Sequence, residues 1–415
     1  MRKKSVFINC METLTANRKH SEARTLLNAG LKESAERQTA ATAPAYVLTK
    51  PYVFPAVDGN MTYHTSWGSH GVKEEAETIL SVLSSFRLRS TLAKINQGPR
   101  LTQYVIEPAP GTQVQSILRR EKEFQAALHC NASLRFDNGY VYIEVPTGTE
   151  TVFLGDMLFD NAFQSSDGFT MAIGMAVDGS KHYIDIAKAC HILISGMTGS
   201  GKSIVLHNLI LSLLMKKDPV QMHLYIIDPK ATEFEYYKNL AACTVVSEVN
   251  GAVDLLKNLC IEMDRRYSVL AAAGCRDIDS YNTKFADAPM RRDIVFIDEL
   301  SDLMSMGGKS VEGHIVRIAQ KARACGIHLV IATQYPVAKV VTGLIKANMP
   351  TKICLRVSTV TNSMVALDMA GGEKLMGHGD MLFLPNGSLS PVRLQGGFVS
   401  ETAINNVVAG LMKNQ

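Results

Sequence analysis

Residues 191–203 read His191-Ile-Leu-Ile-Ser195-Gly-Met-Thr-Gly-Ser-Gly-Lys202-Ser203. The opening apolar run is typical of a buried strand, and the eight residues after it fit the pattern G-x-x-x-x-G-K-[ST] at every specified position. Glycines in such a loop let backbone N–H groups turn toward phosphate oxygens beside the positive end of the following helix. We therefore expect ATP to bind to Gly196, Met197, Thr198, Gly199, Ser200, Gly201, Lys202 and Ser203.

Two residues of this loop have individual roles in phosphate chemistry. Lys202 should reach the β- and γ-phosphates, and the Ser203 hydroxyl should ligate Mg²⁺. Such a loop also needs an acidic site at the end of a neighbouring strand, and Ile294-Val-Phe-Ile-Asp298-Glu299 supplies one. We expect Asp298 to lie beside the Mg²⁺ and Glu299 to accept a proton from the attacking water.

Two further strand ends carry polar residues. Gln334 follows the apolar run 327–333, where its amide can hydrogen-bond the γ-phosphate or the attacking water and so sense hydrolysis. Asp228 ends another apolar run and is followed by Pro229. Because Asp-Pro is a common turn dipeptide, turn formation and a place in the site are both open for Asp228.

Apolar runs and helical patterns alternate on both sides of the loop. Strands are expected at 191–195, 222–228, 294–298, 327–333 and 351–357, and helices from Lys202 onward, within 250–273 and across 310–325. Near-continuous apolar strands separated by helices favour a mostly parallel sheet that is covered on both faces. Residues 166–415 are therefore predicted to form an α/β unit.

Two smaller zones precede this unit. Residues 86–165 contain strand patterns at 101–107 and 140–145 and a helical pattern at 114–128, which predicts a small α+β subdomain. Residues 1–85 are basic and then turn-rich. The first 50 residues hold nine Lys or Arg and four Glu, a balance of +5 in a chain of net charge +4. A solvated arm and a contact with a polyanion or membrane surface are both open for this stretch.

The composition excludes several classes of protein. The chain has 415 residues, of which 46% are hydrophobic and 20% charged, as in a globular protein of two or three domains. Its longest apolar stretch, 204–215, is interrupted by His207 and Asn208 and is shorter than the ~18 residues that a membrane span needs. The eight cysteines form no C-x-x-C pair. We expect a soluble, cytoplasmic protein with reduced thiols and no membrane segment of its own.

The motifs together resemble the FtsK/SpoIIIE family of double-stranded DNA translocases. The matching segments are 196–203, 228–233 (D-P-K-x-x-E), 262–282 (M-x-x-R-Y…Y-N), 298–304 (D-E-x-x-D-L-M), 320–334 and 342–351, with 98–111 similar to the family's α subdomain. The resemblance covers about residues 90–410. It implies a RecA-like P-loop motor preceded by the α subdomain, in a homohexameric ring with duplex DNA in the central channel and ATP between subunits.

The sequence departs from the family pattern in three respects. It has no N-terminal transmembrane helices and no winged-helix γ domain after the motor, a combination expected of a phage, plasmid or mobile-element version. The family's arginine that reaches a neighbour's ATP corresponds to Lys352, and another family arginine corresponds to Met364. Lysine keeps the charge but loses the planar fork. Arg356 and Arg323 therefore remain alternatives to Lys352 as the trans contact.

The leading hypothesis is ATP-driven, largely sequence-independent translocation along double-stranded DNA. Lys374 and Lys309, in glycine-containing segments, are the candidate DNA contacts. A type VII-like protein-secretion ATPase is one alternative, and a non-translocating DNA-binding ATPase ring is another.

Overall fold

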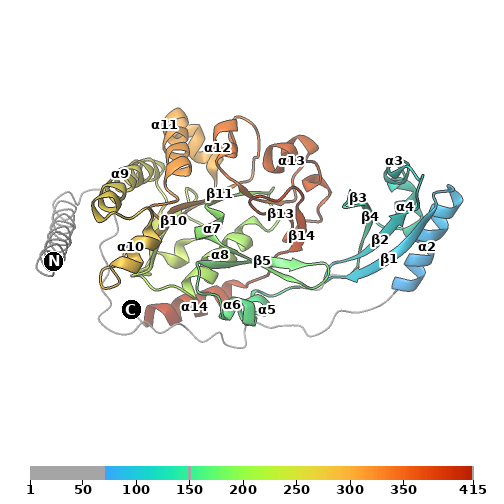
Figure 1. The fold of residues 1–415 in the computed structure, drawn as a ribbon, viewed down its shortest axis with the longest axis horizontal. Coiled ribbons are helices and arrows are strands. Elements are labelled where there is room, and N and C mark those ends of the chain that lie inside the picture. Colours follow the sequence, from blue (N-terminus) through green and yellow to red (C-terminus); the bar gives the residue numbers. More distant parts are fainter. Residues whose placement is uncertain (1–70, 148–150, 414–415) are drawn as a thin grey trace, which may run out of the picture.

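The computed structural model describes residues 71–147 and 151–413, which form a small unit and a large unit (Figure 1). The basic stretch at residues 1–50 lies outside the described residues. The small unit contains an antiparallel sheet in the order β1-β2-β4-β3, and the large unit a ten-stranded sheet in the order β6-β5-β14-β13-β12-β7-β11-β10-β8-β9. In Figure 1 the small unit stands at the end of the large sheet near β14 and β5.

Six neighbouring strands of the large sheet are parallel, and five of them, all but β9, were predicted from the sequence. They are β12 (Thr351–Leu355), β7 (His191–Ser195), β11 (Ile327–Thr333), β10 (Arg292–Ile297), β8 (Met222–Ile227) and β9 (Cys243–Val246). Four antiparallel strands extend the sheet beyond β12: β13 (Asp380–Leu384), β14 (Val392–Gln395), β5 (Thr170–Ala176) and β6 (Lys181–Asp185). The sequence analysis did not predict this extension, because β14 has only four residues and Gly174 interrupts the apolar run of β5.

Helices cover both faces of the large sheet. One face packs against α8 (Lys202–Leu214), α14 (Glu401–Lys413), α5 (Leu154–Leu158) and α6 (Asn161–Gln164). The other packs against α9 (Val249–Ala273), α10 (Ile278–Lys284), α11 (Leu300–Lys321) and α12 (Gly343–Ala347). Side chains along β7 point alternately to the two faces of the sheet. Ile192 and Ile194 pack in the first core, and Leu193 packs in the second. This three-layer arrangement confirms the predicted α/β fold class.

The small unit has its own apolar core. It is built from α2 (Val72–Ser85), α3 (Val114–Leu118), α4 (Glu121–Leu128) and the strands β1 (Ser90–Gln97), β2 (Leu101–Pro108), β3 (Ser133–Asp137) and β4 (Tyr140–Pro146). The two apolar cores divide the chain at points that differ from the expected boundaries. Those boundaries were expected between residues 85 and 86 and between residues 165 and 166. Ile79 and Leu83 of α2 pack inside the small unit, whereas Leu154 and Phe163 pack in the large one. The helix expected over 114–128 is divided into α3 and α4.

A buried ion network joins the two units. Arg393 of β14 donates two hydrogen bonds to Asp380 at the start of β13, at 3.0 and 2.7 Å, and a third to Glu144 of β4. Arg135 of β3 also donates to Glu144, at 3.1 Å. Burial alone would raise the pKa of Glu144, but the two arginines outweigh it and hold that pKa below its usual range. The small unit is therefore held at the antiparallel strands that extend the large sheet.

Within the described ranges, the helices are all too short or too polar to cross a membrane.

Candidate nucleotide-binding site

The predicted phosphate loop lies between the end of β7 and the start of α8. Gly199 and Gly201 have φ angles of 77° and 98°, a left-handed conformation that favours glycine. The Ser200 hydroxyl is buried and has no hydrogen-bond partner among the described residues. A phosphate oxygen is a partner that this group can take, so the loop as folded fits a bound phosphate.

Lys202 and Asp298 meet below the loop. The Lys202 ammonium donates to the Asp298 carboxylate at 2.5 Å and to its backbone carbonyl at 2.6 Å, and both side chains are buried. Mg²⁺ in a phosphate site is usually held by one or two carboxylates together with substrate phosphates. The Asp298 carboxylate and the Ser203 hydroxyl at the start of α8 have the chemistry that such a site needs. Ser203 and Asp298 are the groups that would hold it.

Glu299 lies at the centre of a hydrogen-bond cluster at the carboxyl ends of β10 and β11. Its Oε1 accepts from the Ser301 backbone N–H at 3.2 Å, the Ser301 hydroxyl at 2.8 Å and the Thr333 hydroxyl at 2.7 Å. Its Oε2 accepts from the Gln334 backbone N–H at 2.9 Å. Glu299 is thus both the N-cap of α11 and a buried carboxylate tied to the next strand.

Gln334 connects this cluster to the phosphate loop. Its side-chain Oε1 accepts a hydrogen bond from the Thr198 hydroxyl at 2.8 Å. The structure therefore brings Lys202, Asp298, Glu299 and Gln334 to one edge of the sheet, where the carboxyl ends of three parallel strands meet.

Asp228 has a structural role. Its carboxylate is fully buried and accepts hydrogen bonds from five consecutive backbone N–H groups, those of residues 230–234, at 3.1 to 3.2 Å. Of the two alternatives left open by the sequence, the contacts support turn formation. The carboxylate holds the loop after β8 through these five hydrogen bonds.

The three candidates for the trans contact lie in different surroundings. Lys352 donates to Asp368 at 2.5 Å, and Lys346 pairs with the same carboxylate. Burial would raise the pKa of Asp368, but the two lysines lower it. Arg356 is exposed. Its backbone carbonyl accepts a hydrogen bond from Met197 N–H at 2.9 Å, so this residue lies beside the phosphate loop of its own chain.

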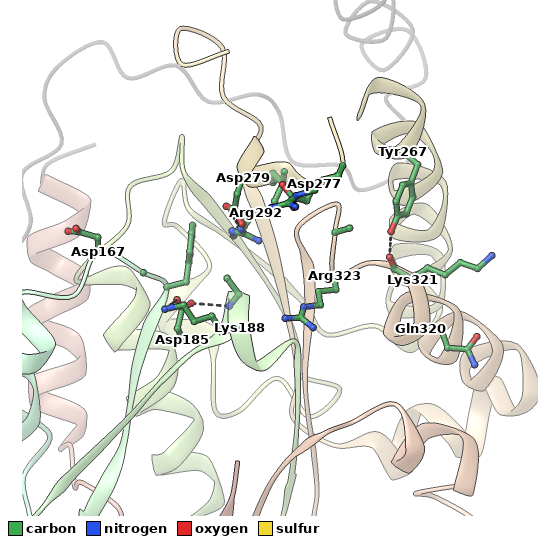
Figure 2. A pocket seen from close by; sticks show the side chains of 16 residues that line it. Asp167, Asp185, Lys188, Tyr267, Asp277, Asp279, Arg292, Gln320, Lys321 and Arg323 are labelled. Atoms are coloured by element: carbon green, nitrogen blue, oxygen red, sulfur yellow. Dashed lines mark hydrogen bonds and ion pairs between the residues drawn. The ribbon is translucent and has the colours of Figure 1, made fainter. Parts of the chain in front are cut away.

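Arg323 lies at the opposite edge of the sheet. Figure 2 shows its side chain at a cavity of about 1180 Å³ that is also lined by Arg292, Asp185 and Lys188. Arg292 begins β10 and Lys188 precedes β7, so this cavity is at the amino ends of the parallel strands. The cavity is therefore at the opposite edge of the sheet from the phosphate loop of the same chain, which follows the carboxyl end of β7.

The two candidate DNA contacts also differ. Lys374 pairs with Glu121 of the small unit at 2.6 Å. Lys309 is exposed and follows Gly308, whose φ of 47° and ψ of −127° interrupt α11. Among the described residues, Lys309 has no recorded ion pair or hydrogen bond.

The sequence analysis missed a segment that packs against the phosphate loop. Gly377, His378 and Gly379 have φ angles of 85°, 51° and 89°, and Gly379 N–H donates to the Ser200 carbonyl at 2.8 Å. A Cβ on Gly201 would lie 2.6 Å from the Gly379 nitrogen, so the two backbones touch. Arg100 of the small unit donates to the Gly377 and His378 carbonyls at 3.3 and 3.2 Å. The pair of glycines around His378 was the available signal.

Comparisons with known proteins identify the family of this chain. The sequence profile of the FtsK/SpoIIIE family matches residues 154–338, and that of the FtsK alpha domain matches residues 59–147. The chain is 40% identical to the DNA translocase SftA of Bacillus subtilis over 377 residues, covering 86% of this chain and 39% of SftA. It is also 40% identical to the DNA translocase FtsK of Caldanaerobacter subterraneus, covering 82% of this chain and 49% of that protein. The chain thus spans less than half the length of these relatives.

Solved structures show the same fold at lower identity. The pCW3 conjugation coupling protein TcpA with ATPγS is 24% identical, with a TM-score of 0.59 over 81% of this chain and 99% of that one. The cytoplasmic domain of the type VII secretion ATPase EccC of Thermomonospora curvata is 23% identical, with a TM-score of 0.55 over 63% of this chain and 34% of that one. The large unit therefore has the fold of a P-loop ATPase motor, as the sequence predicted.

Proposed function

Because the chain belongs to the FtsK/SpoIIIE family, we propose that it hydrolyses ATP and uses the energy to move along double-stranded DNA. The observation that carries this proposal is the meeting of Lys202, Asp298, Glu299 and Gln334 at the carboxyl edge of the sheet. Each of these side chains has one task in a phosphoryl-transfer site of this kind.

In the proposed reaction Lys202 binds the β- and γ-phosphates, and Ser203 and Asp298 hold Mg²⁺. The ion supplies charge neutralisation on the phosphate oxygens when bound. Glu299 accepts the proton of the attacking water, and the Thr333 hydroxyl holds its carboxylate in place at 2.7 Å. Gln334 registers the loss of the γ-phosphate in this proposal, which its hydrogen bonds to Glu299 and Thr198 support.

The proposal extends to a homohexameric ring with sequence-independent DNA binding. Lys309 and Lys374 are the proposed DNA contacts. Lys309 has the stronger support because its side chain is exposed, whereas Lys374 forms an ion pair with Glu121. Lys352 is the proposed trans contact, and it must leave Asp368 to act. Arg356 begins beside its own phosphate loop, which supports a role within one subunit.

One experiment separates this function from the secretion alternative that the fold of EccC raises. ATP hydrolysis and displacement of a DNA triplex are measured with and without linear duplex. Duplex DNA should stimulate hydrolysis, and displacement should require ATP and be absent in the Lys202→Ala variant. Hydrolysis that duplex DNA does not change, with the triplex left in place, would overturn the translocase proposal and favour a protein substrate.

A further inference from the structure

The position of the reactive groups fixes the direction in which a nucleotide extends. Asp298, Glu299 and Gln334 follow β10 and β11, on one side of the β7 strand that leads into the phosphate loop. The terminal phosphate must face these groups to react. The base and ribose therefore extend to the other side of β7, toward the ends of β12, β13 and β14 at the same edge.

The chain that leaves β14 lies along α8 on this other side. Gly396 N–H donates to the Gly379 carbonyl at 2.8 Å, and Gly379 in turn touches the phosphate loop. Asn208 of α8 donates to the Gly397 carbonyl at 2.6 Å. A Cβ on Gly397 would lie 3.1 Å from the Leu154 Cα, so the close backbone approach favours glycine here. The segment 396–398 is thus held against the first turns of the helix that begins at Lys202.

Two phenylalanine rings lie where this segment ends. Phe398 and Phe153 pack edge to face, with ring centroids 6.3 Å apart and planes at 69°. Their backbones are tied by Phe398 N–H to the Val152 carbonyl at 2.7 Å and by Leu154 N–H to the Phe398 carbonyl at 2.9 Å. Phe398 nevertheless remains 44% exposed as a residue. A fixed, partly exposed aromatic ring is a surface on which a flat base can stack.

We propose that Phe398, supported by Phe153, binds the purine base of the nucleotide whose phosphates lie in the 196–203 loop. The proposal rests on nucleotide binding at that loop, which is part of the proposed function. Stacking uses the face of the base and reads few of its edge groups, so the subsite favours the larger purine ring over a pyrimidine.

The test compares three ligands by isothermal titration calorimetry on the full chain with Mg²⁺: ATP, CTP and inorganic tripolyphosphate. In Phe398→Ala the dissociation constant for ATP should rise roughly tenfold, from the loss of one stacking contact. The constant for tripolyphosphate, which has no base, should stay within about twofold. The preference for ATP over CTP should also fall, by less than the loss in ATP affinity, because the pyrimidine of CTP loses a smaller stacking contact.

Two further variants control for folding. Phe398→Trp keeps an aromatic face and should bind ATP within about threefold of the original protein. Phe136→Ala removes a ring that is 47% exposed on β3 of the small unit, and it should leave all three constants unchanged.

The possible failures are distinguishable. If the original protein binds tripolyphosphate but Phe398→Ala binds ATP equally well, the base subsite is wrong and the phosphate site stands. Equal losses of ATP and tripolyphosphate affinity in Phe398→Ala, or failure of Phe398→Trp to bind ATP, would also overturn the subsite. If the original protein binds neither ligand, the proposed function itself is wrong.

Discussion

Replacing Glu299 by Gln tests the proposed base with little change of shape. The carboxylate is 1% exposed and receives four hydrogen bonds, three at Oε1 and one at Oε2 from Gln334 N–H. An amide oxygen at the Oε1 position can keep the first three. The amide NH₂ then faces the Gln334 N–H, donor against donor, and this one bond is lost.

The structure sets the size of two separate effects. Loss of one hydrogen bond to a buried charged group should lower the free energy of unfolding by about 1–3 kcal/mol. Loss of the proton acceptor should lower the rate of ATP hydrolysis by ~10²–10⁴-fold, or about 3–5 kcal/mol in the barrier. ATP binding should persist, because the substitution leaves the phosphate loop and Lys202 unchanged. In contrast, Lys202→Ala should abolish ATP binding and leave Asp298 buried without its partner, at a cost of about 3–5 kcal/mol.

The measurements are steady-state hydrolysis with saturating duplex DNA, ATP binding by calorimetry, and urea unfolding. Glu401→Gln is the matched control, since Glu401 is exposed at the start of α14. It should hydrolyse ATP at the original rate. Hydrolysis by Glu299→Gln at the original rate, with DNA present, would refute the assignment of the base. Loss of ATP binding in this variant would show that the carboxylate supports the phosphate loop instead.

Three other expectations concern the interface, the DNA and acid stability. If rings are assembled with a fraction of Lys352→Ala subunits, the rate of ATP hydrolysis should fall by more than that fraction, since a trans contact of this type contributes ~10³–10⁵-fold in rate. A loss proportional to the mutant fraction would contradict this and point to Arg356. Binding to random duplex should weaken steeply with salt and leave no preferred footprint, and a single site that survives about 0.2 M salt would contradict it. Burial would raise the pKa of Glu262, but two arginines of α9 lower it to about 2, so its stabilisation should be complete above about pH 4.5 and disappear toward pH 2. Between about pH 4.5 and pH 2, the free energy of urea unfolding of the original protein should fall by roughly 3 kcal/mol more than that of Glu262→Gln, which lacks this carboxylate.

The grouping of the candidate site residues could be predicted because these residues follow apolar strands. The carboxyl ends of parallel strands meet at one edge, so Asp298, Glu299 and Gln334 could be placed together from strand assignments alone. The hydrogen bond from Thr333 to Glu299 was missed, although Thr333 precedes Gln334 directly. Strand alternation predicts the face of the sheet to which a side chain points, but it does not predict the carboxylate to which a hydroxyl will donate a hydrogen bond.

The antiparallel extension and its segments beside the phosphate loop were harder to predict. Short strands such as β14 carry little periodicity, and their register depends on neighbours far away in the sequence. The same limit applies to Phe398, which follows two glycines and lies outside any regular pattern. Only the approach of Gly397 to Leu154, across more than 200 residues of chain, brings the ring beside Phe153.

The network at Arg393 shows why contacts between the units could not be predicted from sequence. A buried arginine is costly unless carboxylates surround it, yet either Glu144 or Asp380 alone would look like an ordinary strand residue. Glu144 is 249 residues from Arg393 and belongs to another core. Asp380 follows Gly379, which touches the phosphate loop, so the same arginine that holds the small unit also fixes the start of the strand beside the nucleotide site. One buried charge thus links the position of the small unit to the shape of that side of the site, together with the contacts of Arg100 and Lys374.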